Sequence, residues 1–346
     1  MFLFKKFLSL ILFNEGSQGF NISPYNWIFL SVYYDETMQS GANIRFENIS
    51  SCLNSSNVKI VCFSDLSPSG TLVIRPFWNG KYKRQIAGVF IQILFSDMVV
   101  HFDHFPLLKI RKHYYLMHDV ASLYPGIRRS GSLRAKLFNY FIKKQKDIIT
   151  VSNTTKSNLI DFGLCADRIF VSYNSTSYIG RSSENYVYKY DCCIITTGAK
   201  HKRDKLLLDE LISLETRICL ISSNKEFLEP YSGEANITTI YRASEEVKAL
   251  SLDESKYYIT LSQFEGFGIT VLEALCCKCV CLVSNLSVFI ELFGNSKNVY
   301  FIDINENLKL QLDCLISEER LFLDENLMFP TWEAIAAELD QFFQGV

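Results

Sequence analysis

Residues 262–275, with the sequence SQFEGFGITVLEAL, hold two carboxylates on either side of a turn that contains glycine. The turn follows a strongly apolar run and comes directly before an amphipathic stretch. Gly266 and Gly268 allow the backbone to approach a ligand closely, with N–H groups that face it at the start of a helix. Glu265 and Glu273 are eight residues apart and could contact opposite ends of one polar ligand. The segment therefore predicts a site for one polar ligand at the start of a helix.

Three cations, Lys202, Arg203 and Lys205, lie where a helix at 205–214 is predicted to begin, shortly after Gly198. Cations are unfavourable at a helix N-terminus unless an anion binds there. The cluster therefore predicts a phosphate site, with a solvated helix start as the alternative. The spacing leaves open which of the three cations would hold the phosphate.

His118 and Asp119 follow a predicted strand at 113–117. A histidine at a strand end is often an ordinary structural residue, but the adjacent aspartate favours a functional one. His101 and His104 are close in sequence, yet no acidic or cysteine ligands accompany them at suitable spacing, so a metal site is not expected.

An alternation of short apolar runs and amphipathic stretches must position these residues. The predicted strands are 27–33, 58–64, 71–77, 98–102, 113–117, 147–152, 169–173, 192–197, 217–222, 237–241, 257–261, 279–284 and 299–302. Helices are predicted at 133–144, 154–162, 205–214, 270–277 and 332–343. Near-continuous apolar strands that alternate with helices are typical of parallel sheets covered on both faces. With the polar segment 175–190 as a linker, the pattern predicts two doubly wound α/β domains facing a ligand cleft.

The composition suits this organisation and excludes several classes of protein. The chain has 346 residues, 48% of them hydrophobic, which is enough for two domains. A net charge of −2 does not favour a nucleic-acid binder held by phosphate contacts. The eleven cysteines fall mostly in apolar runs, which indicates small buried side chains in a reducing compartment, although Cys276 and Cys279 form a C-x-x-C pair.

The first thirteen residues, MFLFKKFLSLILF, form an apolar run too short to cross a membrane. They predict a packing segment, with a peripheral membrane contact as the alternative. A basic excess at 109–146 likewise predicts either a solvated surface or one that faces anionic lipid.

The glycine-containing turn resembles the hallmark of the retaining glycosyltransferases of family 4, which have the two-domain GT-B fold. The residues that carry this resemblance are Glu265, Gly266, Phe267, Gly268, Ile269 and, within a Leu-Glu-Ala triplet, Glu273. The resemblance implies that Glu265 meets hydroxyls of a donor sugar and that the backbone of 266–269 approaches the sugar and diphosphate. It implies that Glu273 binds the ribose hydroxyls of the nucleotide.

Looser likenesses extend over most of the chain. His118 and Asp119 resemble a strand-terminal pair whose histidine touches the transferred sugar. Gly198 with Lys202, Arg203 and Lys205 resembles a diphosphate clamp, and Gly41 with Arg45 lies in a segment, 39–46, that resembles a degenerate acceptor-side loop. Residues 148–152, 171–174 and 329–333 also resemble segments of this family. The chain departs from the family at Lys278, where Gly-x-Pro is usual, and at Asn174–Ser175, where Asn-Gly is usual.

The resemblance implies an N-terminal acceptor domain at 1–175, a C-terminal nucleotide-sugar domain at 176–328, and a final helix at 329–346 that packs back toward the first domain. It implies transfer of a hexose from a nucleotide diphosphate sugar to a glycan or polyprenyl-linked glycan, with retention. The expected setting is bacterial O-antigen, capsule or lipopolysaccharide synthesis in the cytoplasm, at the inner face of the cytoplasmic membrane. No metal or other cofactor is expected, and residues 123–125 favour GDP-mannose or a related donor.

Two alternatives stay open on the same scaffold: a nucleotide-sugar epimerase or hydrolase, and a non-catalytic partner subunit. A dinucleotide dehydrogenase is disfavoured because no G-x-G-x-x-G follows the first predicted strand.

Overall fold

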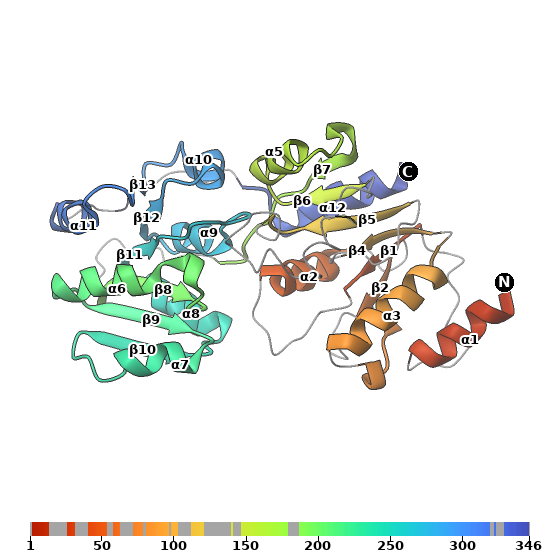
Figure 1. The fold of residues 1–346 in the computed structure, drawn as a ribbon, viewed down its shortest axis with the longest axis horizontal. Helices are drawn as coiled ribbons and strands as arrows, with labels where there is room; N and C mark the ends of the chain where they lie inside the picture. The colour runs from red at the N-terminus through yellow and green to blue at the C-terminus, as the bar shows by residue number, and fades with distance from the viewer. Residues whose placement is uncertain are drawn as a thin grey trace. The chain divides into compact units, whose positions relative to one another are not determined.

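The computed structural model describes residues 2–13, 26–31, 41–53, 58–62, 72–78, 81–96, 98–102, 112–120, 140, 147–178, 187–318, 322 and 329–345. The chain forms two compact units. The first consists of Met1–Ser175 together with Pro330–Val346, and the second of Thr176–Phe329. The final helix of the chain therefore belongs to the first unit, as its colour in Figure 1 also shows.

The described strands of the first unit form one parallel sheet in the order β3-β2-β1-β4-β5-β6-β7. Their bounds are β1 Trp27–Leu30, β2 Val58–Cys62, β3 Leu72–Val73, β4 Val99–Phe102, β5 His113–Met117, β6 Ile148–Thr150 and β7 Ile169–Val171. Ile28 is in register with Lys59 of β2 and Val100 of β4, so the first strand lies in the middle of the sheet. Because β1 to β3 extend the sheet in one direction and β4 to β7 in the other, the sheet is doubly wound.

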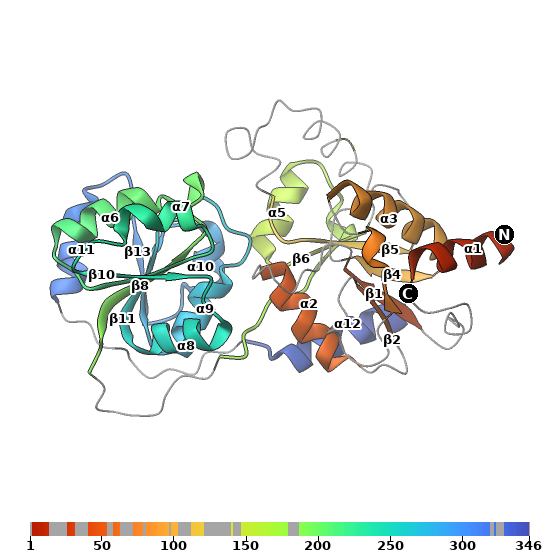
Figure 2. The ribbon, with the colours of Figure 1, turned by 90° about the horizontal axis from the view of Figure 1, so that it is seen from below.

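Helices cover both faces of this sheet (Figure 2). Helices α2 (Gly41–Cys52) and α12 (Trp332–Gln344) pack together on one face, and α1 (Phe2–Leu12) and α3 (Lys81–Leu94) on the other. Helix α5 (Asn153–Asp161) and the short 3-10 turns η1 (Pro76–Trp78) and η3 (Ala166–Arg168) complete the described part of this unit.

Helix α12 is attached to the first unit by an aromatic contact and a hydrogen bond. Trp27 donates from Nε1 to Asp340 Oδ1 at 2.7 Å, and its ring lies 4.6 Å from that of Phe343. Phe342 stacks on Phe170 of β7 at 4.4 Å. These contacts join residues more than 170 positions apart, so the last helix completes the core of the first unit.

The N-terminal helix α1 packs against α3 and the sheet of the first unit. Leu8, Leu12 and Phe13 are buried in a cluster that includes side chains of α3 and the sheet. The indole Nε1 of Trp78 donates to the carbonyl of Ile11 at 3.1 Å. The expectation of a packing segment is therefore met. None of the helices in the described part of the chain is both long and apolar enough to cross a membrane.

The second unit also contains one parallel sheet, with strand order β10-β9-β8-β11-β12-β13. Its strands are β8 Tyr190–Thr196, β9 Ile218–Ser222, β10 Ile237–Tyr241, β11 Ser255–Thr260, β12 Val280–Ser284 and β13 Val299–Ile302. Its helices are α6 Asp204–Ser213, α7 Lys225–Leu228, α8 Glu245–Asp253, α9 Ile269–Cys276, α10 Ser287–Phe293 and α11 Leu308–Ser317, with 3-10 turns η4 Lys200–Lys202 and η5 Glu229–Tyr231. Figure 2 shows α6, α7 and α11 on one face and α8 and α9 on the other.

The direction of winding changes between β8 and β11, which are hydrogen-bonded neighbours. The loops after these two strands therefore leave the sheet side by side. Open α/β sheets bind ligands at such a switch point, beyond the carboxyl ends of the strands. The fold thus brings the segment after Thr196 next to the segment after Thr260.

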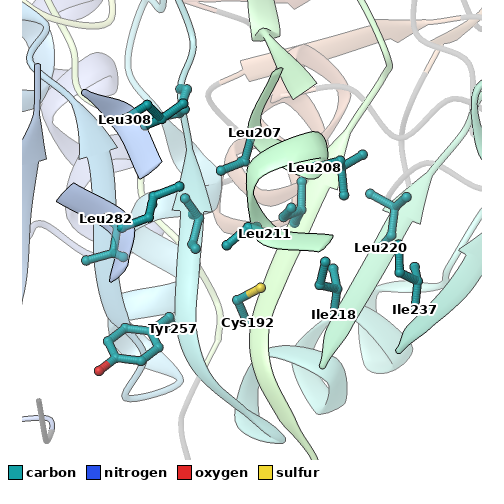
Figure 3. Close-up of a cluster of buried hydrophobic side chains, with 14 of the residues drawn as sticks. Cys192, Leu207, Leu208, Leu211, Ile218, Leu220, Ile237, Tyr257, Leu282 and Leu308 are labelled. Atoms are coloured by element: carbon teal, nitrogen blue, oxygen red, sulfur yellow. The ribbon is translucent and has the colours of Figure 1, made fainter. Parts of the chain in front are cut away.

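The core of the second unit explains why its strands are so strongly apolar. Every residue of β9 and β12 is buried. Leu207, Leu208 and Leu211 of α6 point into a cluster with Cys192 and Leu220 (Figure 3). Burial of each leucine side chain contributes roughly 2 kcal/mol, so this layer holds α6 and the loop before it firmly on the sheet.

A strand is present at each of the thirteen predicted places, with ends that differ by a few residues. The prediction at 71–77 is wrong in its second half, because β3 ends at Val73 and Pro76–Trp78 forms the 3-10 turn η1. The predicted helices at 154–162, 205–214, 270–277 and 332–343 correspond to α5, α6, α9 and α12. The one predicted at 133–144 lies outside the described residues except for 140. All eleven cysteines are free, and seven of them are buried, as predicted for small core side chains: Cys62, Cys192, Cys193, Cys219, Cys277, Cys279 and Cys281.

The expectation of a loop at 41–46 is wrong, because these residues form the first half of α2. Arg45, Phe46 and Ile49 are buried on one side of this helix. Phe46 and Ile49 are buried against the sheet and α12, and this packing stabilises α2. The sequence of the helix is only weakly apolar and therefore does not predict it.

Candidate functional site

The loop after β11 reaches α9 through a left-handed glycine. Gly268 has φ +91° and caps the helix, and a Cβ at this position would lie 2.5 Å from the Phe289 ring. Only glycine fits both the conformation and the space. The N–H groups of Gly268, Ile269 and Thr270 have no acceptor among the described residues, so they form an open, electropositive helix start that can bind an anion.

Glu265 is held in this loop by one hydroxyl and a cation. Its Oε1 accepts a 2.7 Å hydrogen bond from Ser262 Oγ and forms an ion pair with Lys202 Nζ. The carbonyl of Ser262 accepts in turn from Ser284 Oγ, at the end of β12, at 2.6 Å. Oε2 makes no comparable contact with the described residues, so one carboxylate oxygen of Glu265 is fixed and the other is oriented by it.

The loop after β8 contains the second predicted motif. Gly198 has φ +68°, and a Cβ there would lie 2.6 Å from Phe227. Its N–H donates to Thr196 Oγ1 at 3.0 Å. Arg203 is also left-handed, with φ 56°, and its position directly before α6 ends the turn at η4.

Two contacts connect the loops after β8 and β11. The N–H of Gln263 donates to the carbonyl of His201 at 2.7 Å, and Lys202 pairs with Glu265. The Arg203 guanidinium lies 3.0 and 3.2 Å from the Gln263 side-chain amide oxygen in its hydrogen-bonding orientation. The structure therefore brings both predicted motifs of the second unit into one site.

The three cations occupy different environments. Lys202 is engaged with Glu265, and Arg203 is partly buried against Gln263. Lys205 is exposed in the first turn of α6 and forms no ion pair with the part of the chain that the structure describes. Behind them Asp204 is buried and hydrogen-bonded to Thr196 Oγ1, and burial raises the pKa of its carboxyl.

Glu273 lies on α9 and is 2% exposed. Its Oε2 has no hydrogen-bond partner among the residues that the structure describes. Burial raises the pKa of this carboxyl to about 7, Lys248 on α8 opposes the rise, and Glu245 on the same helix adds to it. A buried carboxylate oxygen without a donor is costly, so this position is suited to a ligand that supplies hydroxyls.

In the first unit, His118 and Asp119 directly follow β5 and are half-buried, so both lie at the carboxyl end of a central strand. Gly41 begins α2. Arg45 is fully buried, and its guanidinium donates to the carbonyl of Tyr173 at 2.7 Å, to Asn174 Oδ1 at 2.9 Å and to Ser172 Oγ at 2.7 Å. These bonds give Arg45 a structural role at the end of β7, and the acceptor-side role of Gly41, Arg45 and Asp119 stays a prediction.

The departure from the family pattern at Lys278 has a structural substitute. Lys278 adopts φ 61°, the left-handed conformation for which the usual glycine is suited, directly after α9. Asn174 is buried and accepts from Arg45. In the described part of the chain, no group of three His, Cys, Asp or Glu side chains could hold a metal ion.

Several site residues were not found from the sequence. Ser262 stands three positions before Glu265, a serine-to-glutamate spacing that could have indicated the contact. Ser284 and Lys248 are distant along the chain, and Tyr178 lies in the segment interpreted only as a linker. Their contacts depend on which strands are neighbours, which a single sequence does not reveal.

Comparison with known proteins agrees with this architecture. The family model "Glycosyl transferases group 1" matches residues 223–326, which include Glu265 and Glu273. None of the curated proteins compared matches the chain.

Three solved structures are similar over nearly the whole chain. Sucrose-phosphate synthase from Thermosynechococcus elongatus has a TM-score of 0.68 at 12% identity, covering 92% of this chain and 98% of its own. WaaG, a glycosyltransferase involved in lipopolysaccharide biosynthesis, has a TM-score of 0.65 at 11% identity (92% and 95%). HepE from Anabaena, in complex with UDP and glucose, has a TM-score of 0.61 at 14% identity (92% and 95%). These similarities confirm the predicted α/β fold of the GT-B class.

Proposed function

We propose that this protein is a glycosyltransferase that moves a hexose from a nucleoside diphosphate sugar to a glycan or lipid-linked glycan. The observation that carries the proposal is the pairing of Glu265 with Lys202 beside the open N-terminus of α9. This arrangement offers a hydroxyl acceptor, a cation and free N–H groups within one site, which are the three elements that a sugar diphosphate needs.

The donor is assigned to the second unit. The N–H groups at the start of α9, together with Lys202, Arg203 or Lys205, would bind the diphosphate. Glu265 would accept hydroxyls of the sugar, and Glu273 those of the ribose. A bound donor would also separate Lys202 from Glu265, because the diphosphate would pair with Lys202 and the sugar hydroxyls would donate to Glu265.

Catalysis would depend on stabilisation of the departing diphosphate. As the bond between the anomeric carbon and the phosphate oxygen breaks, positive charge develops on the sugar and negative charge on the diphosphate, and the fixed N–H groups and cations favour the latter. The acceptor hydroxyl forms the new bond to the anomeric carbon and gives its proton to the departing phosphate. His118 is assigned a position beside the transferred sugar, and retention follows from the resemblance to family 4.

The first unit is assigned the acceptor. On α1, Phe7, Leu10 and Ile11 are exposed on one side of the helix while Leu8 and Leu12 are buried. An exposed apolar face of this kind supports a peripheral contact with the inner face of the cytoplasmic membrane. Such a contact would suit a polyprenyl-linked acceptor in O-antigen, capsule or lipopolysaccharide synthesis, the process to which the similar WaaG contributes.

A donor panel tests the proposal. UDP-glucose, UDP-N-acetylglucosamine and GDP-mannose would be screened by thermal shift and then assayed for transfer with Glu265→Ala and His118→Ala as comparisons. We expect one donor to raise the melting temperature and both variants to lose transfer. Donor turnover without an acceptor product would indicate a hydrolase or epimerase, and absence of donor binding would indicate a non-catalytic subunit. Wild-type transfer rates in both variants would contradict the site assignment.

A further inference from the structure

A polar cluster beside Glu273 has no part in the donor-binding scheme above. Lys248 on α8 is 6% exposed, and its Nζ lies 2.5 Å from Glu245 Oε1. Tyr178 donates from its hydroxyl to Glu245 Oε2 at 2.7 Å and lies 3.2 Å from the Glu245 carbonyl oxygen. Oε2 of Glu245 is therefore hydrogen-bonded to a phenol, while Oε1 is within ion-pair distance of a buried ammonium but accepts no hydrogen bond from the described residues.

The cluster is next to the ligand-facing carboxylate because α8 packs on α9. Cys277 Sγ, just after α9, lies 3.8 Å from the carbonyl oxygen of Ala249 on α8. Of the groups that act on Glu273, Lys248 stabilises the ionised form and Glu245 opposes it. The other titratable side chains that interact with Glu273 are Tyr178 in the segment after Ser175, and Cys276 and Cys277 on and after α9.

Stability alone does not account for this ion pair. A buried lysine must be desolvated, and an apolar side chain of similar volume is often as stable or more so. A role toward Glu273 accounts for the buried lysine. Oε2 of Glu273 is buried without a donor among the described residues, and burial raises the pKa of this carboxyl to about 7. Without a positive charge nearby, a larger fraction of this carboxyl would be protonated at neutral pH, and the protonated group is a poorer acceptor for hydroxyls.

We propose that Lys248 is a positioning residue of the donor site: paired with Glu245, which Tyr178 also contacts, its charge favours the ionised form of Glu273, the form that accepts the ribose hydroxyls of a nucleoside diphosphate. This proposal rests on the proposed function. It has a consequence for pH dependence, since a carboxylate that must be ionised binds more tightly as the pH rises. Donor affinity is therefore expected to increase from pH 6 to pH 8 and to level off above.

The first test measures the Glu273 carboxyl directly in the free protein. With glutamate ¹³C-labelled at the carboxyl, and the Glu273 signal assigned by its loss in Glu273→Gln, the titration is followed in wild type, Lys248→Met and Lys248→Arg. We expect the Met variant to raise the pKa of Glu273 by about one unit and the Arg variant to restore it. Lys225→Met, at an exposed position on α7, is the matched control and should leave the titration unchanged. An unchanged pKa in Lys248→Met would overturn the proposal.

The second test measures binding of UDP and of GDP by calorimetry between pH 6 and pH 9. For the nucleotide that binds, Lys248→Met should weaken affinity about fivefold at pH 7 and approach wild type at pH 9. Tyr178→Phe should shift the profile in the same direction by less. An equal loss at every pH would show a merely structural role and reject the positioning role. If neither nucleotide binds wild type, the proposed function fails, while the carboxyl titration still decides whether Lys248 controls Glu273.

Discussion

Replacing Glu273 with glutamine should stabilise the protein at alkaline pH while removing its ability to bind a donor. In the folded protein, burial raises the pKa of this carboxyl from 4.5 to about 7, so the folded state holds the proton more tightly than the unfolded chain. The contribution of this proton to stability is fully present below pH 4.5 and is lost as the pH rises through about 7. Glutamine imitates the neutral form and escapes this loss.

The size of the effect follows from the two pKa values. The difference between 4.5 and about 7 corresponds to roughly 3 kcal/mol of unfolding free energy once the group is fully ionised. At pH 8 Glu273→Gln should therefore be more stable than wild type by about 3 kcal/mol, and at pH 5 by less than about 1 kcal/mol. Lys248 is already included in the pKa, so it does not add to this figure.

Urea unfolding at pH 5 and pH 8, followed by circular dichroism, measures this difference. Glu234→Gln, at an exposed position of the same unit, is the control and should show no comparable gain at pH 8. Equal stability of wild type and Glu273→Gln at pH 8, or a variant that is less stable at both pH values, would refute the reasoning. If Glu273→Gln is more stable than wild type at pH 8 but no longer binds UDP or GDP, the Glu273 carboxylate destabilises the fold and is needed for the ligand.

Three further substitutions test individual parts of the structure. Gly268→Ala should cost about 1–3 kcal/mol because of the left-handed backbone and the Phe289 ring, and should weaken nucleotide binding; unchanged melting and binding would contradict the account of the loop. Arg45→Met should lower unfolding free energy by about 3 kcal/mol in urea titrations, because two buried acceptors and one part-buried acceptor lose their donor, and a variant as stable as wild type would argue against its structural role. Asp340→Ala should cost about 1–2 kcal/mol and shift the fluorescence of Trp27 to the red; an unchanged spectrum would show that the indole bond does not secure α12.

The sheets could be predicted because buried parallel strands are apolar along their whole length. Runs such as 218–222 and 280–284 are buried at every position, so their sequences reveal them. The Glu265 turn could be predicted because left-handed backbone and close packing at Gly268 require glycine. In both cases the physical requirement acts on consecutive residues and leaves a local pattern.

Contacts that depend on strand neighbours could not be predicted. Lys202 meets Glu265 only because β8 and β11 are adjacent, although 63 residues separate them in sequence. Arg45 was interpreted as part of a binding loop, because nothing near it in the sequence shows that it bonds to residues around Tyr173. The burial of Lys248 is another case, since a lone lysine on an amphipathic helix is usually solvated.

The most direct test of the central claim is a transfer assay in which both products are identified. Wild type and Glu265→Ala would be incubated with the donor that passes the binding screen and with lipid-linked glycan acceptors. The nucleoside diphosphate would be quantified and the new glycosidic bond assigned by NMR. We predict release of nucleoside diphosphate in equal amount to a glycoside whose anomeric configuration matches the donor, with at least a hundredfold lower rate in Glu265→Ala, about 3 kcal/mol of lost transition-state stabilisation. A wild-type protein that forms no glycoside from any donor, or a variant as active as wild type, would contradict the account.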